Sequence, residues 1–144
     1  MLDLTMLVIT GEQERTIEEY RTLRNADDID RAMEFFADDA VVKQIPPPPP
    51  PDPGVYTGKP QIRAWMEPQL QQFHVTSRNR QVHGDTVTWE ATVSGDMFRQ
   101  MGIDCFEVTA EARVQGGKIT SLTLTQTPES HSKFQAAMRQ ASAA

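Results

Sequence analysis

Few side chains in this sequence have the type and placement to do chemistry. Tyr20 stands among helix-forming residues, and a phenol inside a dry site can donate a hydrogen bond to a carbonyl or a developing enolate oxygen. It could equally be a packing tyrosine with its hydroxyl near solvent. Gln44 closes a strand-like run, where it could bind a ligand or simply be solvated. Tyr20 is therefore a candidate catalytic residue, and Gln44 a candidate ligand-binding residue.

Proton transfer could involve a histidine or an aspartate at the mouth of a pocket. His74 follows Phe73 at the start of a strand, where an imidazole could act as an acid or a base or could be a surface residue. Asp96 follows the end of an alternating strand. It and Asp104 could lie near an opening, or could be turn residues that bond their own backbone. His74 and Asp96 complete the candidate catalytic set.

The histidines and the single cysteine predict no metal site, and we expect no cofactor. None of His74, His83 and His131 lies four residues from another or beside a carboxylate in a metal-binding motif. Cys105 is the single cysteine, which excludes an intrachain disulfide framework and a cysteine-based zinc cluster. The protein therefore needs no oxidising compartment. We therefore expect the protein in the cytoplasm.

Length and charge limit the classes of function. A chain of 144 residues with 38% hydrophobic content has the size of one domain. Its net charge of −6 argues against nucleic acid and membrane partners, because both attract clustered Lys and Arg. The apolar run Leu2 to Ile9 contains Asp3 and is far shorter than the roughly 20 residues that span a bilayer. We interpret 1–11 as an N-terminal extension and 12–142 as a single domain.

Apolar residues at helical spacing predict four helices. The first helix follows Gly11, and Asp28 supplies a cap before the second. Pro60 and Pro128 suit the first turns of the third and last helices, whereas Pro68 ends or kinks the third. The four stripes are formed by Ile17, Tyr20 and Leu23; by Ile29, Ala32, Met33 and Phe36; by Ile62, Trp65 and Met66; and by Phe134, Ala137, Met138 and Ala141.

Strands are predicted between these helices. Residues 40–45 form one, another starts at Phe73, and apolar and polar residues alternate through 87–93 and 106–114. Two glycines then make a hairpin turn into 119–125. The order helix, helix, strand, helix, four strands, helix predicts an α+β fold, in which a curved antiparallel sheet forms a cone covered by three to four helices.

Six consecutive prolines, Pro46 to Pro51, interrupt the domain. Prolines lack amide donors and favour polyproline II, so residues 46–54 should form an extended, stiff loop of about 3.1 Å per residue. The run could be a rigid lip beside a pocket or a ligand for an aromatic-lined peptide groove. Because it lies inside a folded domain, we interpret it as a lip.

Element order and several short phrases resemble the SnoaL-like branch of the nuclear-transport-factor-2-like superfamily. The phrases are Tyr20 to Ala26 leading into Asp28-Ile29-Asp30, Phe36 to Val41, Tyr56-Thr57-Gly58 before Ile62 to Trp65, and Gly117-Lys118-Ile119. The resemblance implies a cone whose open end admits a small, largely apolar molecule. The superfamily includes ketosteroid isomerases, limonene-type epoxide hydrolases, polyketide cyclases, dehydratases and non-catalytic proteins, so it names no reaction.

The enzyme patterns of the superfamily are incomplete here. The ketosteroid isomerase pattern needs a Tyr on the first helix, a carboxylate base and a buried acid, and only Tyr20 matches. Gln44 stands at the base position and Ala110 near the acid position. The limonene-type pattern needs two carboxylates and an Arg, but its positions fall on the apolar residues Ala91, Val93 and Leu124.

Large apolar side chains suggest what surrounds a ligand. Trp65, Trp89 and Met97, together with Ala110, are candidate ligand-binding residues. The first hypothesis is a protein that binds a small apolar metabolite, with isomerase or cyclase-type chemistry assisted by Tyr20. The second is a non-catalytic dimerisation or partner-binding module, because segment 96–102 could be a dimer contact instead of a lid. The third is an enzyme that uses His74 or Asp96. We expect a homodimer.

Overall fold

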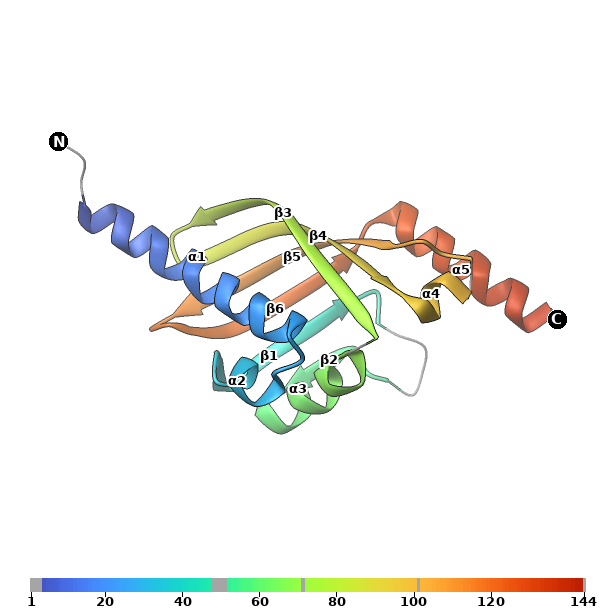
Figure 1. The fold of residues 1–144 in the computed structure, drawn as a ribbon, viewed down its shortest axis with the longest axis horizontal. Helices are drawn as coiled ribbons and strands as arrows, with labels where there is room; N and C mark the ends of the chain where they lie inside the picture. The colour runs from blue at the N-terminus through green and yellow to red at the C-terminus, as the bar shows by residue number, and fades with distance from the viewer. Residues whose placement is uncertain (1–3, 48–51, 71, 101, 144) are drawn as a thin grey trace.

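The structure is a computed structural model that describes residues 4–47, 52–70, 72–100 and 102–143. Within them five α-helices accompany a six-stranded sheet, so the predicted α+β fold class is confirmed (Figure 1). In chain order the elements are α1 (Leu4–Asn25), α2 (Ile29–Met33), β1 (Phe36–Ile45), β2 (Val55–Thr57), α3 (Lys59–Met66), the 3-10 turn η1 (Glu67–Gln69), β3 (Phe73–His83), β4 (Thr86–Gly95), α4 (Asp96–Gln100), β5 (Phe106–Gln115), β6 (Lys118–Gln126) and α5 (Pro128–Ala143).

The strands are ordered β2-β1-β6-β5-β4-β3 across the sheet. All neighbouring strands are antiparallel except β1 and β6, which run parallel with Val42 beside Leu122. The expectation of a wholly antiparallel sheet is therefore wrong for this pair. Alternation reveals a strand but not its direction, and the long stretch of chain between β1 and β6 leaves room for the crossover that a parallel pair needs.

Irregular pairing curves the sheet. The register shifts between Phe36 and Val41 on β1, between Arg78 and Gln81 on β3, and at the start of the β5–β6 pairing. Asn79, inside the β3 irregularity, has a φ of 57°, in the left-handed region. Such bulges bend a strand and increase its twist. The sheet therefore wraps around its apolar face.

The main core lies between this concave face and the helices. α1 packs on β3, β4 and β5, and α3 packs on β1 and β2. Ile17 and Ile62 from the helices are buried together with Val42, Val87 and Leu122 from the strands. The strand residues belong to the apolar phase of the alternating pattern, as the sequence predicts, because period-two side chains point to one face.

Three boundaries differ from the sequence predictions. α1 begins at Leu4, so the border expected after residue 11 falls inside a continuous helix, whose first turns project past the sheet in Figure 1. Phe36 does not end the second helix but begins β1, because its ring fills the core. The short strand 55–57 was not predicted, since three residues carry no measurable period.

The structure describes only part of the proline run. Pro46 follows a cis peptide bond from Ile45, whereas residues 48–51 of the proline run lie outside the described residues. The segment 96–100, expected as a loop, is the short helix α4. Among the described residues, no helix combines the length and apolar character needed to cross a membrane.

Candidate ligand-binding site

A cavity of about 1030 Å³ lies between α1, α3, the concave face of the sheet and α5. Its walls are mainly apolar, and its polar groups gather toward α1 and toward the mouth beside β1 and β2. The largest apolar side chains in the lining are Trp65, Trp89, Phe73, Phe98, Phe106 and Phe134. The volume and the mixture of an apolar wall with few polar groups are typical of small-molecule sites.

Tyr20 lines this cavity from α1. Only 6% of the residue is exposed, and its ring contacts the ring of Phe36 edge-on at 5.2 Å between centroids. Burial raises the pKa of Tyr20 above its ordinary value of 10.0, although the Arg24 guanidinium opposes the shift. Its hydroxyl makes no hydrogen bond to the residues that the structure describes. Tyr20 is thus a neutral donor without a protein acceptor.

Arg24 lies one helical turn beyond Tyr20 and also lines the cavity. It is 6% exposed, and its Nη2 donates to Gln69 Oε1 at 3.1 Å. Gln69 Nε2 in turn donates to the Trp65 carbonyl oxygen at 2.9 Å. Arg24 Nη1, Trp65 Nε1 and Ser77 Oγ are buried and have no hydrogen-bond partner among the residues that the structure describes. This end of the cavity therefore presents donors that lack acceptors.

The mouth is built around Tyr56. Its hydroxyl donates to Asp52 Oδ1 at 2.7 Å and lies 3.3 Å from Gln44 Oε1. Its ring stacks on Trp65, with 5.6 Å between the centroids. Burial and the Asp52 carboxylate raise the pKa of Tyr56, so the phenol stays protonated. Gln44 thus lies in the lining, in contact with another side chain of the mouth.

Four phenyl rings close the end of the cavity beneath α5. Phe73 and Phe98 stack at 4.7 Å, Phe98 meets Phe106 edge-on at 4.3 Å, and Phe106 meets Phe134 at 5.6 Å. These rings come from β3, α4, β5 and α5. α4 therefore contributes a wall through Phe98, whereas the side chain of Met97, a candidate ligand-binding residue, lies outside the described residues.

Three candidate residues lie away from the cavity. His74 is exposed on β3, on the face opposite its neighbours Phe73 and Val75, which do line the cavity. Asp96 is exposed and pairs with Arg99. Neither residue is part of the lining, so the structure gives no support to an acid or base role for them, and that role stays a prediction. Ala110 is also absent from the lining, because it lies in the core between its cross-strand neighbours Trp89 and Leu124.

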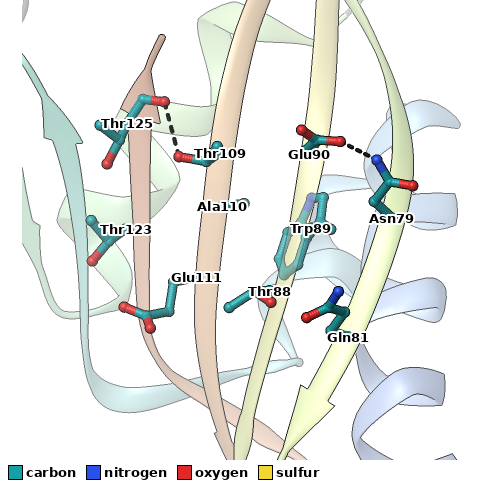
Figure 2. A pocket seen from close by; sticks show the side chains of 10 residues that line it. All are labelled: Asn79, Gln81, Thr88, Trp89, Glu90, Thr109, Ala110, Glu111, Thr123 and Thr125. Atoms are coloured by element: carbon teal, nitrogen blue, oxygen red, sulfur yellow. Dashed lines mark hydrogen bonds between the residues drawn. The ribbon is translucent and has the colours of Figure 1, made fainter.

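The other face of the sheet carries a shallow groove of about 550 Å³. Figure 2 shows its polar side chains, including Glu90 hydrogen-bonded to Asn79 and Thr109 donating to the Thr125 carbonyl oxygen at 3.5 Å. Apart from Trp89 and Ala110, its lining residues are all polar. This groove lacks the apolar wall of the concave cavity, so the cavity is the better candidate for an apolar ligand.

Comparison with known proteins identifies the fold family. The model of the SnoaL-like domain matches residues 17–122. The chain belongs to the SnoaL-like domain family. This family is part of the nuclear-transport-factor-2-like superfamily, so the resemblance seen in the sequence is confirmed. No curated protein matches the sequence.

Solved structures share this SnoaL-like fold at low sequence identity. A Mycobacterium tuberculosis epoxide hydrolase like limonene epoxide hydrolase has a TM-score of 0.69 and 18% identity, with 90% of this chain and 92% of that chain covered. A Sinorhizobium meliloti protein described as a candidate polyketide cyclase has 0.62 and 21%, with 76% and 93% covered. A Bacillus subtilis protein described as a candidate isomerase has 0.66 and 17%, with 85% and 94% covered. These likenesses show the fold alone.

Arg24, Asp52 and Tyr56 are site residues that the sequence analysis did not single out. Arg24 had a signal, because it follows Tyr20 by four residues and so shares its helix face. Asp52 and Tyr56 meet only through the path of the loop before β2, which periodicity does not encode. Among the described residues, no three side chains of His, Cys, Asp or Glu group as metal ligands would. The expected absence of a metal stays a prediction.

Proposed function

We propose that this SnoaL-like domain binds a small, largely apolar metabolite in the concave cavity. The supporting observation is the cavity of about 1030 Å³ itself, with aromatic walls and a buried, unpartnered phenol. Burial of apolar ligand surface against Trp65, Trp89 and the phenyl rings supplies the free energy of binding. Tyr20 orients the ligand by donating a hydrogen bond to one of its oxygen atoms.

Isomerase or cyclase-type chemistry is the second function that we propose for the same cavity. A neutral tyrosine can stabilise an enolate oxygen as charge develops, and this effect is large where water is excluded. The Gln44 side chain cannot accept a proton near neutral pH. Asp52 and His131 are the side chains of the lining that could accept a proton. If the protein catalyses such a reaction, one of these two residues would be the base.

The dimer module of the second hypothesis has less support. Phe98, which belongs to the segment 96–102 considered as a dimer contact, is buried in its own chain. The side chains of Met97 and Met101 lie outside the described residues. The homodimer and the cytoplasmic location stay predictions, the latter resting on the single Cys105.

The binding proposal is tested with a matched pair of neutral probes, acetophenone and ethylbenzene, which differ by one carbonyl oxygen. Both probes should change tryptophan fluorescence, because Trp65 and Trp89 line the cavity. Tyr20→Phe should weaken acetophenone binding about threefold to tenfold, the usual effect of one hydrogen bond, and leave ethylbenzene binding unchanged. β-Ionone, which is larger, serves as a third probe.

His74→Gln is the matched control, because His74 lies on the opposite face of the sheet. It should bind all three probes as the wild type does. If none of the probes shifts the melting temperature or the fluorescence of the wild type, the cavity does not bind apolar molecules and the proposal fails. Equal weakening of both small probes by Tyr20→Phe would assign the phenol to packing.

A further inference from the structure

We infer that the metabolite carries a carboxylate, and that Arg24 binds this group at the α1 end of the cavity. The inference rests on the proposed function and specifies its ligand class. It starts from the guanidinium of Arg24, which carries a full charge at every physiological pH. At 6% exposure this charge is almost wholly removed from water.

The protein does not neutralise this charge. Arg24 makes no ion pair with the residues that the structure describes, and the one acceptor that it has among them is the uncharged amide oxygen of Gln69. Its Nη1 is buried without an acceptor. A buried charge without a counterion carries a large desolvation cost, and natural proteins rarely keep one without a use.

Neighbouring donors lack acceptors as well. Trp65 Nε1 and Ser77 Oγ are buried without partners in the described part of the chain, and both residues line the same cavity as Arg24. The Tyr20 hydroxyl is close enough for Arg24 to affect its pKa, and it too has no acceptor within the described ranges of the chain. A carboxylate accepts several hydrogen bonds and carries the missing charge, so it suits a lining with free donors around a buried guanidinium.

The charge of the lining supports an anionic ligand. Its positively charged residues are Arg21, Arg24 and Arg139, and its negatively charged residue is Asp52. The chain as a whole, in contrast, has a net charge of −6. Arg21 is paired with Glu18 at 2.9 Å, and Asp52 accepts from Tyr56 at the mouth. Glu18 also pairs with Arg80, so the charges around the cavity leave an excess of arginine, and low-dielectric walls strengthen the field of the buried Arg24.

The remaining walls determine the rest of the ligand. Beyond Arg24 the cavity is enclosed by aromatic rings and aliphatic strand residues, which favour an apolar body. A neutral carbonyl would satisfy Tyr20 but would leave the guanidinium without a counter-charge. A planar carboxylate matches the fork of an arginine and neutralises it with a single group.

The test compares decanoate and phenylpropanoate with their methyl esters, which keep the shape and the carbonyl but lose the charge. At neutral pH the wild type should bind each acid at least about tenfold more tightly than its ester, or about 1.4 kcal/mol. Arg24→Met keeps a similar apolar stem and should reduce this preference to within about twofold, leaving ester affinity nearly unchanged. Tryptophan fluorescence and calorimetry measure the dissociation constants.

Two further variants complete the design. Arg31→Met removes an exposed arginine from α2, outside the cavity, and should keep the full acid preference. Arg24→Lys keeps the charge and should retain part of the preference. This second variant keeps the inference testable if Arg24→Met does not fold. Equal binding of acid and ester by the wild type, or an unchanged preference in Arg24→Met, overturns the inference while ester binding leaves the proposed function intact. Binding of neither acid nor ester overturns both.

Discussion

Tyr20 and Arg24 lie one turn apart on α1, and both side chains line the concave cavity. Burial raises the pKa of the phenol, whereas the guanidinium opposes this shift. The two groups are therefore electrostatically coupled as well as adjacent. A ligand oxygen bound between them would accept from a neutral and a charged donor at once, and charge-assisted hydrogen bonds are the stronger kind.

The buried guanidinium leads to a prediction for the protein without ligand. The double variant Arg24→Met, Gln69→Met removes the charge together with the amide that accepts from it, and it should be at least as stable as the wild type. Arg24→Met alone should be less stable than the double variant, because Gln69 Oε1 loses its donor. Urea unfolding measures both. A double variant less stable by more than about 1 kcal/mol would contradict the idea that the charge serves binding at the expense of stability.

Both tyrosines of the chain should resist ionisation in alkali. Burial raises the pKa of Tyr20 and of Tyr56 above the ordinary value of 10.0, and Asp52 adds to the shift at Tyr56. Because the folded state prefers the protonated phenols, stability present below pH 10.0 should be lost as the pH rises beyond it. Tyrosinate absorbance follows the titration. A folded protein that titrates with a midpoint at or below 10.0 would show that the phenols are solvated.

Acid should weaken the protein through Glu107. A hydrogen bond from Arg78, at 2.5 Å, lowers the pKa of Glu107 below 4.5 and outweighs partial burial, which raises it. The stabilisation is therefore present above pH 4.5 and is lost as the pH falls below it. Glu107→Gln should flatten the acid limb of the stability curve and cost at most about 1 kcal/mol at neutral pH, since the pair is largely exposed. Glu111→Gln, on the same strand, should leave that limb unchanged.

Gly95 should tolerate no side chain. A Cβ built there would lie 2.3 Å from the Gln72 carbonyl oxygen and 2.9 Å from Phe73 Cδ1. Because the nearer atom belongs to the backbone, Gly95→Ala should displace the start of β3 and destabilise the fold by about 1–3 kcal/mol. Ser94→Ala, one residue earlier, is the control and should change the unfolding midpoint little. Equal midpoints for Gly95→Ala and the wild type would mean that β3 moves freely.

The sequence predicts the strands and helices well where many residues repeat a pattern. Apolar and polar residues alternate through 87–93 and 106–114, and a half-buried strand is the element that explains such runs; each lies within a strand of 10 residues. Phe36 shows the limit of this reasoning. It fits the stripe of the preceding helix, but tertiary packing places it in β1, where its ring fills the core. The direction of β1 relative to β6 is likewise a property of the whole chain.

The candidate site is predicted less completely. Tyr20, Gln44, Trp65 and Trp89 line the cavity, because helix and strand periods determine which face each shares. His74 lies outside the lining for the same physical reason, since successive side chains along a strand point to opposite faces of the sheet. Contacts such as Tyr56 to Asp52 arise where a loop brings distant residues together, and no local pattern encodes them.

Different elements of the fold supply the polar part and the aromatic part of the cavity lining. In the binding mode that we propose, hydrogen-bond donors for the ligand head come from α1 and its neighbours, whereas the rings around the ligand body come from β3, α4, β5 and α5. Substitutions at the phenylalanine positions would leave Arg24 in place. They would therefore change the length and shape of ligand that fits without removing the residue proposed to bind its carboxylate. Selectivity for the charged head of the ligand and the size of its apolar body would therefore be determined by different elements of one small domain.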